Sequence, residues 1–383
     1  MKVALVHDYL VQDGGAERVL RVLQELYPEA PTFTLVYRAD TMGRLFQGKD
    51  IRTSFLQKLP WGKTHYQWYL PLMPRATESF DLSSCDVVLS SSSAFAKGIL
   101  TGPETLHLCY CHTPTRYLWT ESAQYVQELR YPGFVKACIP PLLARLRVWD
   151  RLAADRVDAF VANSRNVASR ITKYYRRESH VIYPPVEVQL FSLSSKPPQP
   201  YFLTGGRLVS YKRFDLVVRA FNALGIPLKI FGEGPEETHL KALAKPHITF
   251  LGKISDAERA GFYRNAQAFI HPQVEDFGIT PVESMASGRP VIAYGKGGIL
   301  ETVIQGETGV MFEEQTWECL ADTVIRFPEH QWDPLRIRAH AMQFSKERFM
   351  REMKTFVDQK WEEFNQNSRV ASREWLILYG HRH

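Results

Sequence analysis

The sequence predicts an α/β protein built from two doubly wound, Rossmann-like domains that face a central cleft. The first observation is the length of 383 residues, which exceeds one ordinary core and suits two domains of roughly 150–200 residues each. The second is an alternation of short apolar runs with helical patterns, which is typical of parallel strands joined by crossover helices. The third is a composition with 45% hydrophobic and 23% charged residues, which indicates a packed globular chain.

The first predicted domain covers residues 1–190 and begins directly with a strand. A Gly14-Gly15 turn follows, and then a helix over about residues 16–26. The later apolar runs lie between helical patterns and are therefore predicted to be buried parallel strands. The strands predicted in this domain are Val3–His7, Thr32–Tyr37, Val87–Ser90, Leu106–Cys111, Val157–Ala162 and His180–Tyr183.

The second predicted domain covers residues 191–349 and has the more regular pattern. The stretch from Phe191 to Pro200 is rich in Ser, Pro and Gln, so it is predicted to be the linker between the domains. A helix over residues 350–383 is expected to return and pack on the first domain. The strands predicted in the second domain are Tyr201–Thr204, Leu228–Phe231, Ile248–Leu251, Ala268–His271, Pro290–Ala293 and Gly309–Phe312.

Charge and composition exclude several classes of protein. The net charge of +6 is spread along the chain, so no nucleic-acid partner is expected. The chain begins with a strand rather than a signal peptide, and no run reaches the ~18–20 apolar residues that cross a bilayer. The five cysteines are odd in number and form no CxxC pair, which fits a reducing cytosol. We therefore expect a cytoplasmic protein.

The segment from Glu275 to Glu283 is the strongest functional motif. It follows a predicted strand, and Thr280 and Pro281 suit the cap and the first position of a helix. The amides of such a helix start form an anion site suited to a diphosphate. Glu275 would accept hydrogen bonds from sugar hydroxyls, and Glu283 from the hydroxyls of a ribose. Two alternatives remain open, because Thr280-x-x-Glu283 also fits a capping box and Glu275-Asp276 also fits a solvated acidic loop.

A second motif runs from Gly205 to Arg213, after the first strand of the second domain. The glycines permit a tight turn, so that Arg207 and Lys212 can converge on phosphate oxygens. A departing nucleoside diphosphate gains negative charge, and cations placed there stabilise the transition state. The alternative interpretation is a basic surface loop.

With Gly-Gly-Arg-x4-Lys followed by Glu-x7-Glu, the chain resembles the GT4-type retaining glycosyltransferases of the GT-B fold. The segment from His112 to Tyr117 looks most like bacterial mannosyl- and rhamnosyltransferases of surface polysaccharide synthesis. The resemblance spans nearly the whole chain and is most specific in the second domain. Further matching segments are Gly14–Glu17, Asn163-Ser164, Gly232–Pro235, Ser287–Val291 and Gly297-Gly298.

The resemblance implies a nucleotide-sugar site. Arg207 and Lys212 would hold the donor diphosphate, Glu275 the transferred sugar and Glu283 the ribose. His112 would lie near the donor sugar, whereas without the resemblance a buried core histidine is the better interpretation. Further contacts to the donor are implied for Gly15, Gly206, Gly234, Phe277, Gly278 and Ile279.

The resemblance also implies the mechanism, because no second carboxylate stands in the position of a nucleophile. We expect substitution on one face of the sugar, in which the leaving phosphate helps to deprotonate the acceptor hydroxyl. No Asp-x-Asp motif occurs in a loop, so no divalent metal and no other cofactor are expected. The competing functions are a nucleotide-sugar hydrolase or epimerase and a non-catalytic binding protein. An NAD dehydrogenase is poorly supported, because no GxGxxG follows the first strand.

GDP-mannose is the predicted donor, with UDP-glucose or another UDP-sugar as the alternative. The predicted acceptor is a saccharide or a saccharide linked to a lipid diphosphate. Basic and aromatic stretches at Lys58–Tyr69, Arg130-Tyr131 and Pro141–Trp149 suit an anionic membrane, here the inner face of the cell membrane. A solvated face over core aromatics fits these stretches equally well.

Overall fold

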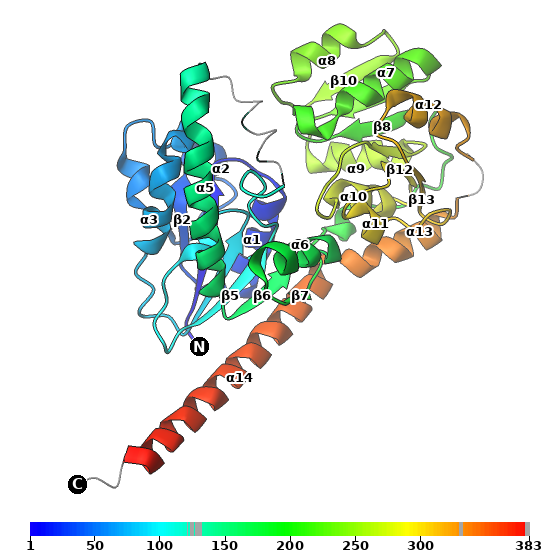
Figure 1. Ribbon diagram of the computed structural model, residues 1–383. Coiled ribbons are helices and arrows are strands. Elements are labelled where there is room, and N and C mark those ends of the chain that lie inside the picture. The colour runs from blue at the N-terminus through cyan, green and yellow to red at the C-terminus, as the bar shows by residue number, and fades with distance from the viewer. Residues whose placement is uncertain (121, 123–125, 127–131, 329–331, 380–383) are drawn as a thin grey trace. The chain divides into compact units, whose positions relative to one another are not determined.

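The computed structural model describes residues 1–120, 122, 126, 132–328 and 332–379. The chain divides into two units, one from Met1 to Ile182 together with the chain from Met350 onward, and one from Tyr183 to Phe349 (Figure 1). Each unit is a parallel sheet with helices between its strands. The predicted pair of doubly wound α/β domains is confirmed.

The sheet of the first unit has seven strands among the described residues, in the order β3-β2-β1-β4-β5-β6-β7, and every neighbouring pair is parallel. All six predicted strands are present. The strand that the sequence did not reveal is β3, whose Ile-Arg-Thr segment is short, lies at the edge of the sheet and alternates between half-buried and exposed positions. The strands are β1 Val3–Leu10, β2 Thr32–Tyr37, β3 Ile51–Thr53, β4 Val87–Ser92, β5 Leu106–Cys111, β6 Ala159–Ala162 and β7 Ser179–Val181.

The helices of this unit form where apolar positions recur at helical spacing. In α1, Val19, Leu20 and Leu23 lie on one buried face. The helix α6 begins at a serine cap, because the Ser164 hydroxyl accepts a hydrogen bond from the amide of Val167. The described helices are α1 Gly15–Leu26, α2 Ala39–Met42, η1 Phe55–Lys58, η2 Tyr66–Leu72, α3 Met73–Glu78, η3 Ala96–Gly98, α5 Gly133–Asp155 and α6 Arg165–Tyr175.

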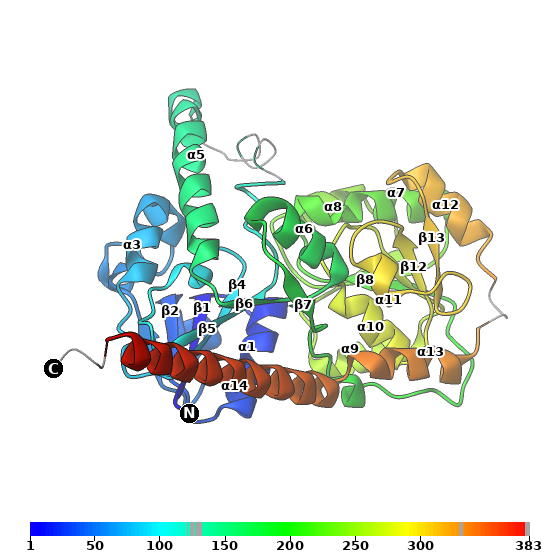
Figure 2. The same ribbon diagram turned by 60° about the horizontal axis from the view of Figure 1, so that its bottom comes forward.

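The C-terminal helix α14, Lys346–Tyr379, joins the first unit from Met350 onward. Met353, Phe356 and Val357 are buried, and the ring of Phe356 stacks on His180 with centroids 5.4 Å apart. Figure 2 shows α14 as one long helix that follows α13 in the chain. The chain from Met350 onward therefore belongs to the same compact unit as residues 1–182.

The sheet of the second unit has six strands among the described residues, in the order β10-β9-β8-β11-β12-β13. All six were predicted to within two residues at each end. The strands are β8 Phe202–Gly205, β9 Leu228–Phe231, β10 Ile248–Gly252, β11 Phe269–His271, β12 Val291–Tyr294 and β13 Gly309–Phe312. The helices are η4 Val188–Leu190, η5 Ser210–Lys212, α7 Phe214–Leu224, α8 Glu237–Leu243, α9 Asp256–Asn265, α10 Ile279–Ala286, α11 Ile299–Thr302, α12 Trp317–Ile325, α13 Pro334–Ala341 and η6 Met342–Phe344.

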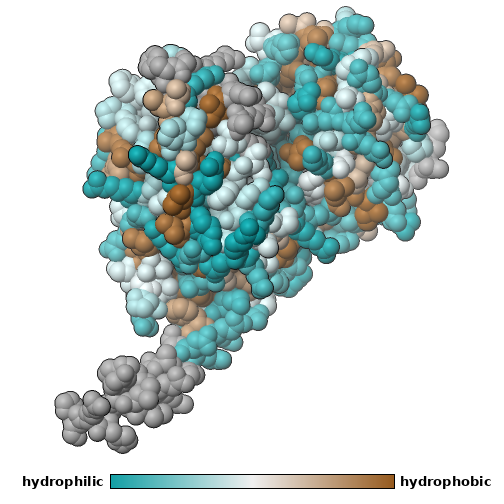
Figure 3. All heavy atoms as spheres, in the orientation of Figure 1, coloured by the Kyte–Doolittle hydropathy of each residue, from teal (hydrophilic) through white to brown (hydrophobic). Residues whose placement is uncertain are grey.

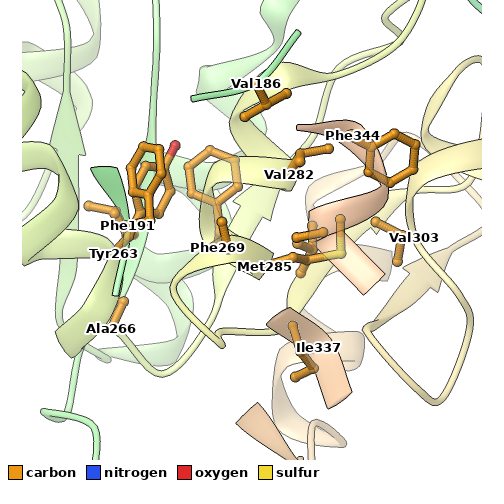
Figure 4. Close-up of a cluster of buried hydrophobic side chains, with 14 of the residues drawn as sticks. Val186, Phe191, Tyr263, Ala266, Phe269, Val282, Met285, Val303, Ile337 and Phe344 are labelled. Carbon is orange, nitrogen blue, oxygen red and sulfur yellow. The ribbon is translucent and has the colours of Figure 1, made fainter. Parts of the chain in front are cut away.

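The boundary between the units lies before Tyr183, whereas the sequence placed it after residue 190. The reason is the apolar side chains of this segment: in the core of the second unit, Val186 packs beside Val282 of α10 and Phe191 beside Tyr263 of α9 (Figure 4). The ring of Tyr183 lies 5.6 Å from that of Phe277 in the same unit. The second unit thus begins several residues before the stretch whose composition resembles a linker.

Candidate functional site

The two sequence motifs meet at the carboxyl edge of the second sheet. Strand β8 pairs with β9 on one side and with β11 on the other, so the strand order reverses between β8 and β11. Ligands of open α/β sheets bind at such a point. Lys212 follows β8 and Glu275 follows β11, and Nζ of Lys212 lies 2.9 Å from Oε1 of Glu275. A Cβ placed on Gly206 would lie 3.3 Å from the same Nζ.

A third loop fixes the backbone around Glu275. The amide of Gly298 donates to the carbonyl of Glu275 at 2.8 Å, and Glu275 forms a parallel bridge with Gly297. A Cβ on Gly297 would lie 2.6 Å from the carbonyl oxygen of Glu275, and one on Gly298 would lie 2.2 Å from that of Asp276. The Gly-Gly pair therefore lets two loops touch through their backbones, which holds the Glu275 carboxylate in place.

The charge of Glu275 is set by its neighbours. Burial by itself raises the pKa of this carboxyl, but the Lys212 ammonium, the His271 ring and a hydrogen bond from Gln273 outweigh it and hold the pKa at about 2. Nε2 of Gln273 donates to Oε1 of Glu275 at 3.2 Å. Glu275 is thus a carboxylate at every physiological pH, able to accept hydrogen bonds but unsuited to act as an acid.

His271 and Gln273 belong to this site, although the sequence did not single them out. His271 is fully buried, and neither of its ring nitrogens nor Oε1 of Gln273 has a hydrogen-bond partner among the residues that the structure describes. A Cβ placed on Gly278 would lie 3.9 Å from Nε2 of His271. Burial lowers the pKa of His271 to about 4, so the ring is neutral at pH 7. The sequence signal was present, since His271 ends β11 and Gln273 lies between that strand and Glu275.

The helix α10 starts earlier than the sequence predicted. Its N-cap is Gly278 in a left-handed conformation, φ +95°, and Ile279 is the first helical residue. Thr280 is therefore not the cap, and Pro281 occupies the third helical position, where its missing N–H costs no intrahelical bond. No side chain in the described part of the chain caps this helix start. The amides of its first turn remain suited to an anion, as predicted, but through a glycine turn.

The capping-box interpretation of Glu283 is wrong. Its carboxylate is buried and accepts hydrogen bonds from Nη2 of Arg259 at 3.2 Å and from the hydroxyl of Tyr263 at 3.3 Å. Both partners lie on α9, so Glu283 joins α9 to α10.

Arg207 and Gly234 lie in neighbouring loops with different roles. The Arg207 side chain is exposed and forms no hydrogen bond or ion pair within the described part of the chain, so it is not drawn into the Lys212–Glu275 pair. A Cβ on Gly234 would lie 2.2 Å from the carbonyl oxygen of Leu208. Gly234 is thus required for the close approach of the loop after β9 to the loop that carries Arg207.

In the first unit, His112 lies at the end of β5 and is buried. Its Nε2 lies 2.8 Å from the hydroxyl of Ser91, and its carbonyl oxygen accepts from Nδ2 of Asn163 at 2.9 Å. Burial, with a smaller effect of His7, lowers the pKa of His112 to about 3. Gly15 is the first residue of α1, whose N-cap is Gly14.

Two further searches concern only the described residues. No group of three or more His, Cys, Asp or Glu side chains is arranged there to hold a metal ion. None of the helices described combines the length and the apolar character that crossing a bilayer requires. Of the basic and aromatic stretches, Arg130-Tyr131 lies outside the described residues.

Family comparisons cover both units. Residues 13–190 match the family described as Glycosyltransferase Family 4, and residues 186–344 match Glycosyl transferases group 1. The boundary between the two matches falls in the same segment as the boundary between the structural units.

Curated relatives align over part of their length. The alpha-1,3/1,6-mannosyltransferase ALG2 of Mus musculus is 27% identical over 273 residues, which are 62% of this chain and 62% of the relative. An uncharacterized glycosyltransferase of Methanocaldococcus jannaschii is 25% identical over 205 residues, 52% of this chain and 58% of the relative. The D-rhamnosyltransferase WbpZ of Pseudomonas aeruginosa is 29% identical over 174 residues, 40% of this chain and 46% of the relative. The chain thus spans less than two thirds of the length of each.

Solved structures match the whole fold. HepE of Anabaena in complex with UDP superimposes with a TM-score of 0.71 at 16% identity, covering 94% of this chain and 100% of that one. Sucrose-phosphate synthase from Thermosynechococcus elongatus gives a TM-score of 0.71 at 16% identity, with the same coverage. At this identity the likeness shows the fold alone.

Proposed function

We propose that this chain, which belongs to the GT4-type glycosyltransferases of the GT-B fold, is a retaining enzyme that moves mannose from GDP-mannose to a saccharide or lipid-linked saccharide. The observation that supports this most directly is the pairing of Lys212 with Glu275 beside the uncapped start of α10. An ammonium and a helix N-terminus suit a diphosphate, and a carboxylate suits the hydroxyls of the attached sugar. Arg207, Gly206 and the turn from Phe277 to Ile279 would complete the grip on the donor, with Glu283 on the ribose.

The chemistry we propose needs no acid or base from the protein. The bond from the anomeric carbon to the phosphate oxygen breaks, and the acceptor oxygen bonds to the same face of the sugar. The acceptor proton passes to the departing phosphate. A pKa of about 2 makes Glu275 too weak a base to take that proton. Lys212 and the α10 amides stabilise the charge on the leaving diphosphate, and we propose that no divalent ion is required.

The donor is tested by thermal shift against a panel of nucleotide sugars in the presence of EDTA. A ligand that binds only the folded protein adds about 2.7 kcal/mol of stability at 100 times its Kd. GDP-mannose should therefore raise the melting temperature by several degrees, and UDP-glucose by much less. The mannosyl- and rhamnosyltransferase relatives favour GDP-mannose, whereas the UDP bound to HepE keeps UDP-sugars as the second candidate.

Release of the nucleotide then separates the competing reactions. A transferase liberates GDP only when an acceptor is present, and the new glycosidic bond has the anomeric configuration of the donor. Rapid liberation of GDP without an acceptor would instead identify a hydrolase. A shift given by UDP-sugars alone would overturn the donor assignment.

We also propose that the enzyme is cytoplasmic and attaches to an anionic membrane through the segment Ser54–Thr77 of the first unit. This segment contains Lys58, Lys63 and Arg75 but no Asp or Glu. Its aromatic platform, which consists of Trp61, His65 and Trp68, is exposed: Trp61 by 66% and Trp68 by 54%. Tryptophan and basic side chains together favour the interface of anionic lipid.

The aromatic platform is held in a fixed shape. Trp61 has φ +52°, a backbone conformation that residues other than glycine seldom adopt. The hydroxyl of Tyr69 donates to the carbonyl of Pro60 at 2.7 Å, and the rings of Trp61 and Trp68 lie 6.0 Å apart. Hydrophobic side chains also lie among hydrophilic ones along α5 (Figure 3), where Val148 and Leu152 are exposed.

Sedimentation with vesicles tests this attachment. Vesicles of phosphatidylglycerol and phosphatidylcholine should bind the protein at low salt, and pure phosphatidylcholine should not. The W61S/W68S variant should bind at least about tenfold more weakly, because burying half of each indole is worth ~2 kcal/mol. L335S, at a position of α13 that is 69% exposed in the second unit, is the control and should bind like the parent. Indifference of the parent protein to anionic vesicles would rule the attachment out.

A further inference from the structure

A chain of four polar side chains leads to His112 in the first unit. Strands β1 and β4 are neighbours, and His7 of β1 stands opposite Ser91 of β4 in the register. Nδ1 of His7 lies 3.1 Å from the Ser91 hydroxyl, which lies 2.8 Å from Nε2 of His112. At the other end, Nε2 of His7 lies 3.8 Å from Oε1 of Glu17. All four residues are buried.

The Ser91 hydroxyl gives this chain a single direction. Among the described residues the Ser91 hydroxyl contacts only these two rings, so when both rings are neutral its one proton goes to one histidine and it accepts from the other. The tautomer of the neutral His7 ring therefore determines which nitrogen of His112 carries hydrogen. Glu17, at the end of this hydrogen-bond series opposite His112, determines which groups donate and which accept.

Glu17 can only accept, so its charge favours the tautomer of His7 that carries hydrogen on Nε2. Nδ1 of His7 then accepts from Ser91, and Ser91 accepts from Nε2–H of His112. At 3.8 Å the carboxylate acts through its charge or through a bridging water rather than a direct bond. The glycine at position 14 leaves room for this carboxylate, because a Cβ added there would lie 2.8 Å from Oε2 of Glu17.

We propose that Glu17, His7 and Ser91 are positioning residues, which hold His112 in its Nε2–H tautomer so that Nδ1 accepts a hydrogen bond from a hydroxyl of the transferred sugar. This inference rests on the proposed function. Within the described residues no group bonds Nδ1 of His112. An unprotonated nitrogen attracts a hydroxyl and repels a phosphate oxygen, so this arrangement selects the sugar rather than the diphosphate. The depressed pKa of His112 keeps the ring neutral, as such an acceptor must be.

The tautomer is measured without any substrate. Nitrogen NMR of the full chain labelled with 15N-histidine, at pH 8.5, should show hydrogen on Nε2 of His112. In E17Q the amide at position 17 donates to Nε2 of His7, which reverses the chain, and His112 should then carry hydrogen on Nδ1. S91A removes the hydroxyl that connects His7 to His112, so His112 should then show a mixture of both tautomers. E25Q removes the same charge from an exposed position on α1 and should leave the spectrum unchanged.

Activity provides the second arm. E17Q and S91A should lower kcat/KM for the nucleotide sugar by about tenfold in protein that is still folded at the assay temperature; S91A should also melt earlier than the parent, because two buried histidine nitrogens lose their partner. The same assay is repeated with donors whose sugar lacks the 2-, 3-, 4- or 6-hydroxyl. With the analogue that lacks the hydroxyl contacted by His112, the parent and E17Q should be equally active. Hydrogen on Nδ1 of His112 in the parent, or an unchanged spectrum in E17Q, would overturn the proposal. If the tautomer switches as expected but no nucleotide sugar is bound or turned over, the proposed function fails instead, and with it the sugar contact.

Discussion

Replacement of Lys212 by methionine is expected to lower kcat for sugar transfer by about 10²–10³-fold, the usual cost of losing one preorganised group that stabilises charge in the transition state. Methionine keeps most of the length of the side chain and removes only the ammonium. That ammonium lies 2.9 Å from Glu275, at the switch point of the second sheet. Because the leaving diphosphate carries most charge in the transition state, kcat and kcat/KM should fall together in steady-state assays of nucleotide release.

A matched control is available on α8. Lys241 also pairs with a glutamate, Glu237, at 2.6 Å, but its side chain is 53% exposed. K241M removes the same charge from the same domain and should leave the kinetics within about twofold of the parent, as expected for a surface ion pair. If K212M keeps more than a tenth of the parent activity and its fold, Lys212 does not stabilise the leaving group.

The fold could be predicted because its strands are buried on both faces. Runs such as Leu106–Cys111 and Leu228–Phe231 are continuously apolar, and their bounds agree with the structure at both ends. The edge strand β3 lacks that signal. The domain boundary was misplaced because composition does not report burial: Val186 was assigned to the first domain and Phe191 to the start of the linker, yet both are buried in the core of the second unit.

The candidate site could be predicted only where spacing along the chain carried the information. Lys212 and Glu275 follow neighbouring strands, so their motifs predicted a shared location, and the 2.9 Å contact confirms that they meet. The orphaned nitrogens of His271 depend on burial from several directions, which no local pattern reports. The buried partners of Glu283 lie on α9, 24 and 20 residues earlier in the sequence. For the same reason, local spacing could not decide between a capping box and an interhelical pair.

The carboxylate of Glu275 should make the free energy of unfolding depend on pH between about 4.3 and about 2. Its pKa is about 2 in the folded chain and about 4.3 when unfolded. A depressed folded pKa contributes stability above the unfolded value, and that contribution is lost as the pH falls toward 2. The difference of about two pKa units corresponds to ~3 kcal/mol at neutral pH, of which about half is gone by pH 3.

Comparison with E275Q isolates this contribution. Glutamine keeps the shape of the side chain and its acceptor for Lys212 but does not titrate, whereas every other group titrates in both proteins. The free energy of urea unfolding of the parent minus that of E275Q should therefore decrease by ~1.5 kcal/mol between pH 7 and pH 3. E237Q, which removes the carboxylate of the exposed α8 pair, should change by less than about 1 kcal/mol over the same range. A difference between parent and E275Q that stays constant with pH would mean that the folded protein does not hold Glu275 as a stabilised carboxylate. The proposed electrostatic coupling at the donor site would then be lost, because a carboxyl that titrates alike in the folded and the unfolded chain gains no stabilisation from the Lys212 ammonium beside it.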